Sequence, residues 1–342
     1  MPKRGRPSHT AAKVARMFVF AGRYTRYAPL LPSGAAELAE RLLIETGAMK
    51  PWMQRFYASP RNRAGIERFA ERFGPGQLAR MALRKRFMDD EIRAALAAGA
   101  TQVLVVGAGY DTACMRLAAE FEDRLFVEID HPATHESKRA GVEALGAMRP
   151  NLRLLSADLG ETTLVEALAT LDQAAGEADL GPERSEGVGT RAGAAEHDPS
   201  RARRREGNPW DAEARSIVIA EGLLMYLERE DVVRFFAALH ELTGPGSRVA
   251  FTYMRCDGHG RPYAGKLASG ITRVSLKLLG EALRFCVADE RELGDLVEPL
   301  GWRYEPDPER FDLGTRYLAP AGMDDRERAD VFEYMAVVDR AR

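Results

Sequence analysis

The stretch Val103–Thr112, VLVVGAGYDT, decides the fold of this chain, because a short apolar run ends there in a glycine-rich turn. Gly107 and Gly109 let the backbone turn sharply and approach a ligand closely, where a Cβ would be in the way. Such a turn after a strand is typical of α/β proteins that bind an adenosine cofactor, although it can also be purely structural. The cofactor could be a nicotinamide or flavin dinucleotide for hydride transfer, or S-adenosylmethionine for methyl transfer.

Similar short runs, rich in β-branched residues, recur along the chain and are separated by helical or loop material. They are Gln102–Val106, Leu125–Ile129, Leu152–Leu155, Ser216–Ala220 and Arg248–Tyr253, while Trp302–Tyr304 and Thr315–Ala319 could supply closing strands. Strands that alternate with helices indicate a mostly parallel sheet covered on both faces. We therefore expect an α/β fold with a seven-stranded sheet.

The rest of the chain divides into segments of different texture. Residues 1–10 are basic and lack periodicity, which is typical of a disordered tail. Residues 11–98 have the apolar spacing of helices, best seen in Met81–Leu96, and are expected to form a lid and acceptor region. Residues 99–342 would form the cofactor-binding core. Within it, residues 174–207 carry almost no large apolar side chain and are predicted to be a disordered insertion.

Composition narrows the class of protein. The 342 residues carry a formal net charge of -2, so no global charge favours nucleic acid or an anionic membrane as the main partner. The three cysteines, Cys114, Cys256 and Cys286, show neither paired spacing nor a metal-ligand pattern, and we expect buried reduced thiols and no metal site. No apolar stretch is long enough to span a membrane, so a reducing cytoplasm is the expected location. The Arg-Gly-Arg-Pro tetrapeptide at residues 4–7 resembles an AT-hook, but a single copy is weak support for a DNA-associated protein.

Two carboxylates follow the second and third predicted strands. Asp130 ends the run Glu128-Ile-Asp and could accept hydrogen bonds from both hydroxyls of an unphosphorylated ribose, which either cofactor would offer. Asp158 could accept a hydrogen bond from an adenine amino group while Leu159 flanks the ring, or it could simply cap the helix that follows. These residues indicate adenosine without choosing between the cofactors.

Two positions favour S-adenosylmethionine. Thr112 stands where a dinucleotide fingerprint has its third glycine, beside the pyrophosphate. Glu221 follows the strand Ser216–Ala220, where its charge suits an ammonium or a sulfonium and is awkward beside a pyrophosphate. A glutamate at a helix start remains the structural alternative.

Together, the segments VLVVGAGYDTACMRL, FVEIDHP, SADL and EGLLMYL resemble the leucine carboxyl methyltransferase-like family of class I S-adenosylmethionine-dependent O-methyltransferases. The resemblance extends to Arg84–Asp90, which is similar to the family's R-T-R-F-x-D-D element, to Gly280-Glu281 and to Leu300–Trp302. It implies a Rossmann-like class I methyltransferase fold with an N-terminal helical lid. The sequence departs from the family pattern at Lys85, which replaces the usual threonine, and in the long insertion.

The resemblance also implies roles for individual residues toward S-adenosylmethionine. Arg84 would bind the methionine carboxylate, and Gly107, Ala108 and Gly109 would pass beside the methionine and ribose. Asp130 would take the ribose hydroxyls, and Asp158 with Leu159 the adenine. Glu221 would lie near the amino-acid end, with Tyr226 close by.

The expected reaction is in-line transfer of a methyl group to a carboxylate or hydroxyl of a small-molecule acceptor. No general base is identified, because His131 and His135 are expected at the surface. Trp52, Phe56, Tyr57, Met81 and Phe87 are candidates for the acceptor pocket, although core packing is the alternative for each. An NAD(P)-dependent oxidoreductase is the competing enzyme class, and neither the acceptor nor the oligomeric state can be read from the sequence.

Overall fold

The computed structural model describes residues 8–73, 76–171, 209–263, 283–324 and 333–341. The predicted insertion at 174–207 and most of the predicted basic tail at 1–10 lie outside these residues. Gly280-Glu281 and the AT-hook-like tetrapeptide also lie outside them. The boundaries predicted for the lid and core segments stay predictions.

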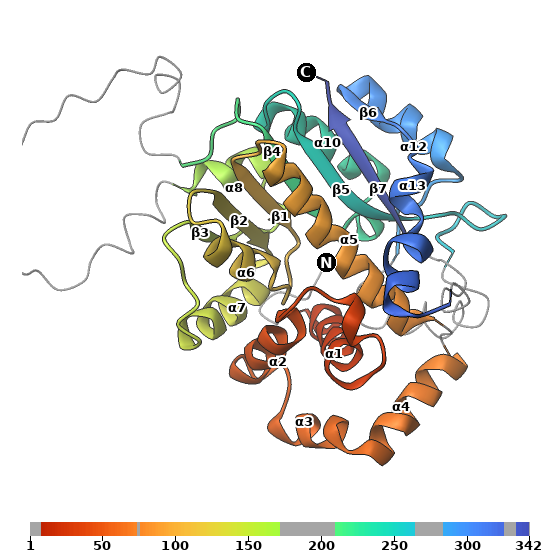
Figure 1. Cartoon of the computed structure of the whole chain (residues 1–342). Helices are drawn as coiled ribbons and strands as arrows, with labels where there is room; N and C mark the ends of the chain where they lie inside the picture. The colour runs from red at the N-terminus through yellow and green to blue at the C-terminus, as the bar shows by residue number, and fades with distance from the viewer. Residues whose placement is uncertain (1–7, 74–75, 172–208, 264–282, 325–332, 342) are drawn as a thin grey trace, which may run out of the picture.

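A seven-stranded sheet with the order β3-β2-β1-β4-β5-β7-β6 forms the centre of the protein (Figure 1). Strands β1 to β5 are parallel, and β7 runs antiparallel to both β5 and β6. The strands are β1 (Gln102–Val106), β2 (Leu125–Asp130), β3 (Leu152–Ser156), β4 (Ser216–Ala220), β5 (Arg248–Met254), β6 (Trp302–Tyr304) and β7 (Glu333–Arg340). The strand order reverses between β1 and β4, and such a switch point opens a ligand crevice at the carboxyl ends of the strands. The predicted α/β fold with a mostly parallel seven-stranded sheet is confirmed.

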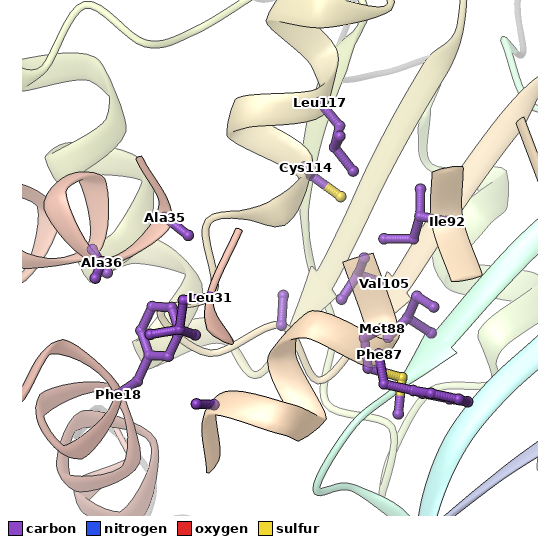
Figure 2. Packing of buried hydrophobic residues seen from close by; sticks show 14 of the residues in the cluster. Phe18, Leu31, Ala35, Ala36, Phe87, Met88, Ile92, Val105, Cys114 and Leu117 are labelled. Atoms are coloured by element: carbon purple, nitrogen blue, oxygen red, sulfur yellow. The ribbon is translucent and has the colours of Figure 1, made fainter. Parts of the chain in front are cut away.

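Alternation along the central strands supplies a hydrophobic core on each face of the sheet. In β1, Val103 and Val105 pack into one cluster, and Leu104 and Val106 pack into the other. This is the period-two geometry of a strand buried on both faces. Figure 2 shows part of the first cluster, which includes Ile92 from the helix before β1, Val105 and the buried Cys114.

Helices cover both faces of the sheet and gather at one of its ends. In Figure 1, α1 to α4 lie together below the sheet and α5 crosses in front of it. The helices are α1 (His9–Tyr24), α2 (Ala35–Glu45), α3 (Pro51–Ala58), α4 (Pro60–Phe73), α5 (Gln77–Ala97), α6 (Ala113–Glu120), α7 (Pro132–Ala144), α8 (Leu164–Ala169), α10 (Arg229–Leu242), α12 (Glu290–Val297) and α13 (Pro308–Phe311). Short 3-10 helices include Leu224–Tyr226. The predicted helix over Met81–Leu96 is confirmed as part of α5.

The strand expected at Thr315–Ala319 is wrong. Residues Gly314–Leu318 instead form a π-helix, at whose start the Thr315 amide donates to Asp312 Oδ1 at 3.0 Å. The remaining sheet position belongs to β7, which pairs with β5 over seven residues. A β-branched or aromatic pair in a short segment is weak evidence for a strand, because such residues are equally suited to packing one side of a helical turn against the core.

The expectation that all three cysteines are reduced thiols is wrong for two of them. Cys256 and Cys286, 30 residues apart in sequence, form a disulfide, whereas Cys114 is free and buried. The two are brought together because the backbone around Val287 runs beside the end of β5, with the Cys256 amide donating to the Val287 carbonyl at 2.9 Å. The correction concerns the thiol state of these two residues, and the predicted cytoplasmic location stays a prediction.

Candidate functional site

A cavity of about 360 Å³ opens at the carboxyl ends of the central strands, where the strand order reverses. Met81, Met88 and Ile92 of α5 contribute to its lining, as do residues at the start of α1, namely Ser8, Thr10, Ala11, Val14, Ala15, Met17 and Phe18. All nine residues predicted to bind the cofactor line this one cavity: Arg84, Gly107, Ala108, Gly109, Asp130, Asp158, Leu159, Glu221 and Tyr226. The tertiary structure therefore brings the predicted site residues together, while their individual roles stay predictions.

The glycine turn after β1 requires backbone conformations that side chains disfavour. Gly107 has φ +71° and Gly109 has φ +51°, both in the left-handed region. A Cβ on Gly107 would lie 3.2 Å from Leu223 Cδ1, so space is also tight there. The turn is fastened to β2, because the Gly107 amide donates to the Ile129 carbonyl at 2.8 Å. It presents bare backbone to the cavity.

Asp130 ties the end of β2 to that turn. One carboxylate oxygen accepts a hydrogen bond from the Gly109 amide, and the other accepts from the His131 amide at 2.7 Å. Burial raises the pKa of Asp130 above its usual value, and the backbone donors only partly offset it. Each oxygen keeps a lone pair that a ligand hydroxyl can use. Glu128, in contrast, is buried away from the cavity in an ion pair with Lys138 Nζ at 2.5 Å.

Asp158 does not cap a helix. Thr163 caps α8 in a reciprocal arrangement with Glu166, so the capping alternative for Asp158 is wrong. Asp158 Oδ1 accepts from the Gly160 amide at 3.0 Å, while Oδ2 lies 3.5 Å from His131 Nε2. His131 lines the cavity, which corrects its predicted surface position. The only indication in the sequence that His131 lies at the site is its position directly after Asp130.

His135 is also only partly exposed, contrary to the prediction. Its Nε2 lies 3.2 Å from the Leu154 carbonyl oxygen. Burial lowers the pKa of His135 below its usual value. It faces β3 and not the main cavity.

A cluster of five charged side chains, which we call the charge cluster, closes one part of the cavity. It comprises Arg84, Lys85, Asp111, Glu221 and Glu333. Arg84 Nε lies 2.6 Å from Glu221 Oε1, and Arg84 Nη1 pairs with Glu333. Lys85 Nζ pairs with Asp111 and lies 3.0 Å from Glu221 Oε2. The helix-initiating alternative for Glu221 is wrong, since the residue bridges two cations at the end of β4.

The charges of the charge cluster hold one another ionised despite burial. Burial alone would lower the pKa of Lys85, but the carboxylates of Asp111 and Glu221 outweigh it and raise the pKa. Burial alone would raise the pKa of Asp111, but Lys85 outweighs it and holds the pKa well below its usual value. Two cations face three carboxylates, so the charge cluster has a net charge of -1.

The aromatic candidates for the acceptor pocket mostly lie elsewhere. Met81 lines the cavity, but Phe87 is buried against Phe311, with ring centroids 5.4 Å apart. Trp52 is 63% exposed and Phe56 is 43% exposed, on helix α3, away from the cavity. Helical spacing in the sequence identified these side chains as apolar but not the direction in which they point.

Three further residues that line the cavity belong to no motif of the sequence. Phe18 and Met17 reach the cavity from α1, and Glu333 reaches it from the start of β7. Because these elements lie far from the motifs along the chain, only the fold brings them together. Among the described residues, no group of three His, Cys, Asp or Glu side chains is arranged to hold a metal ion.

The chain is similar in sequence to proteins named as methyltransferases. The leucine carboxyl methyltransferase family model matches residues 35–175. A Mycobacterium marinum protein is 29% identical over 225 residues, which cover 65% of this chain and 62% of the relative. A Parafrankia protein is 32% identical over 174 residues, which cover 50% of this chain and 43% of the relative. Both are provisionally named as S-adenosyl-L-methionine-dependent methyltransferases.

Solved structures show weaker likeness. A crystal structure provisionally named as a methyltransferase, from Thermobifida fusca, covers 88% of this chain and 94% of its own, at 18% identity and a TM-score of 0.46. The matched regions span about 62% and 43% of the lengths of the two curated relatives. The chain is therefore similar to the leucine carboxyl methyltransferase family over residues 35–175 and to these relatives over about half to two thirds of its length.

Proposed function

We propose that this protein is an S-adenosylmethionine-dependent methyltransferase that methylates a carboxylate or hydroxyl oxygen of a small molecule. The observation that carries the proposal is the anionic lining of the cavity around a bare glycine turn. Asp130, Asp158 and Glu221 enter it from the ends of three strands. Three carboxylates suit a cofactor that bears a sulfonium and an ammonium, and the names of the relatives agree with this assignment.

The residues present fit that cofactor. Asp130 has free lone pairs for ribose hydroxyls, and the left-handed Gly107 and Gly109 leave room for close approach of a ligand. Asp158 and Leu159 would hold the adenine, and Glu221 the ammonium of the amino-acid end, with Tyr226 and Ala108 beside it. When bound, S-adenosylmethionine supplies an activated methyl group whose sulfonium leaves as a neutral thioether.

The protein's own contribution is positioning and exclusion of water. Helix α1 lies over the cavity through Val14, Met17 and Phe18, which present apolar surface to it. Its start is fastened to α7, since the Ser8 amide donates to Thr134 Oγ1 at 3.1 Å. With ligands bound, this apolar roof would keep water from the reacting atoms and help to hold the acceptor in line. A carboxylate acceptor would need no general base.

A dinucleotide-dependent oxidoreductase fits the cavity less well. Thr112 is buried where the fingerprint glycine would lie, with its hydroxyl directed to the Ala35 carbonyl at 3.4 Å. Asp111 and Glu221 would face a pyrophosphate with like charge, which costs binding energy. No observation on the described residues favours the oxidoreductase or a nucleic-acid role. None of the described helices has the length and apolar character to cross a membrane.

Calorimetry with purified protein tests the proposal. We expect S-adenosylmethionine and S-adenosylhomocysteine to bind, and NAD+ and NADPH to show no binding under the same conditions. A screen that follows release of S-adenosylhomocysteine over carboxylate and phenol acceptors then identifies the acceptor class. Binding of NADPH without binding of S-adenosylmethionine would overturn the assignment.

A further inference from the structure

Lys85 occupies a distinctive place in the cavity. It extends from α5 to the turn after β1 and to the end of β4, where its ammonium contacts Asp111 and Glu221. Its side chain is only 16% exposed, yet it lines the cavity. The family resemblance places a threonine here, so this chain holds an extra cation between the two elements that would bind the cofactor's amino-acid end.

The neighbouring Arg84 is more fully committed to the protein. Its Nε and Nη1 pair with Glu221 and Glu333, and its Nη2 lies 3.4 Å from the Met81 sulfur. A planar guanidinium that pairs with two carboxylates of its own chain cannot swing toward a ligand without breaking these ion pairs. Its geometry suits fixing Glu221 and Glu333 in place.

The ammonium of Lys85 has capacity left. It carries three N–H donors, and Asp111 and Glu221 account for two of them. It is also a point charge on a flexible stem, which can follow a ligand over a short distance. An incoming carboxylate would meet Asp111, Glu221 and Glu333, so it needs a cation in direct contact to offset their repulsion.

We propose that Lys85 binds the carboxylate of the cofactor's methionine moiety, and that Arg84 acts mainly as a positioning residue for Glu221. This inference rests on the function proposed above. It changes the expected assignment, in which Arg84 alone takes the carboxylate. It also gives the lysine that replaces the family's usual threonine a part in cofactor recognition.

Two ligands that differ in one group test the inference. S-adenosylmethionine carries the carboxylate, and its decarboxylated analogue keeps the adenosine, sulfonium and ammonium. We expect Lys85→Met to weaken binding of S-adenosylmethionine about tenfold to a hundredfold, the scale of a lost charge-assisted hydrogen bond. The same variant should bind the analogue as well as the wild type does, or better. Calorimetry measures both affinities directly, without turnover.

Further variants separate binding from folding. Lys85→Arg keeps a cation and should retain the preference for the carboxylate, whereas Lys85→Thr, with the family residue, should lose it. Lys50→Met, at an exposed lysine before α3, is the matched control and should bind both ligands normally. Thermal unfolding of each variant verifies that it is folded.

Three results would overturn the inference. Equal loss of both ligands in Lys85→Met would show that Lys85 only supports Glu221 and Asp111. A carboxylate-specific loss in Arg84→Met, with none in Lys85→Met, would return the role to Arg84. Failure of the wild type to bind either ligand would instead refute the proposed function, and this inference with it.

Discussion

Asp130 lines the cavity, and its carboxylate accepts hydrogen bonds from two backbone amides. The Gly109 and His131 amides organise its oxygens, so a ribose would meet acceptors that are already oriented. Preorganisation of this kind reduces the entropy lost on binding. The residue was identified from its place at the end of a strand, and the structure adds the two amides that hold it.

We expect Asp130→Ala to weaken binding of S-adenosylmethionine about tenfold to a hundredfold, because hydrogen bonds from ligand hydroxyls to a charged acceptor are lost. Calorimetry on the folded variant measures the change. Asp123→Ala, at a side chain that is 72% exposed, is the matched control and should bind normally. Unchanged affinity in Asp130→Ala would show that this carboxylate serves only to hold the turn.

At the scale of elements, the segment after residue 282 links the end of β5 to the cavity. The Arg284 amide donates to the Met225 carbonyl at 2.8 Å, and the Val287 amide donates to the Met254 carbonyl at 3.0 Å. The Cys256–Cys286 disulfide links this segment covalently to the residues that follow β5. Met225 and Tyr226 line the cavity, so this element supports one of its walls.

We expect dithiothreitol to lower the free energy of unfolding of the wild type by about 3.6 kcal/mol, the chain-entropy effect of a loop of roughly 30 residues. Denaturant unfolding with and without the reductant measures it. The Cys256→Ser, Cys286→Ser double variant should show no such difference, whereas Cys114→Ala should keep it. Detection of three free thiols in the native, non-reduced protein would contradict the disulfide.

At the scale of the whole molecule, Leu171 and Trp210 are the core residues on either side of the predicted insertion. Both side chains belong to the cluster on the same face of the sheet, and Trp210 Nε1 donates to the Leu242 carbonyl at 2.8 Å. The composition between them offers little apolar surface to bury. Stability should therefore depend on the two anchors.

We expect replacement of residues 176–206 by a Gly-Ser linker of about ten residues to change Tm by less than about 2 °C. Differential scanning calorimetry measures the shift. Trp210→Ala should lower Tm clearly in the same experiment, because a buried tryptophan and its hydrogen bond are removed. A fall of more than about 4 °C in the deletion variant would show that the segment contributes to the folded core.

Much of the fold was predictable because it depends on local pattern. Five parallel strands and the helix over Met81–Leu96 follow from runs and periods within a few residues. The closing strand was misplaced, since residues 315–319 carry a pattern that either a strand or a helical turn can satisfy. The remaining strand of the sheet is β7, because it pairs with β5, which lies far from it in sequence.

The sequence by itself determined which motifs line the cavity: the glycine turn, Asp130, Asp158 and Glu221 each follow a strand, and parallel strands end at one edge. Only the tertiary structure decided which charges meet there. The sequence around Glu221 does not indicate that its carboxylate contacts Arg84 and Lys85. Likewise, the residues around Cys256 do not indicate that it pairs with Cys286. The energy of such a contact depends on distance in space. Lys85 and Glu221 are 136 residues apart in sequence, and Cys256 and Cys286 are 30 residues apart, so each pair meets only when the sheet assembles.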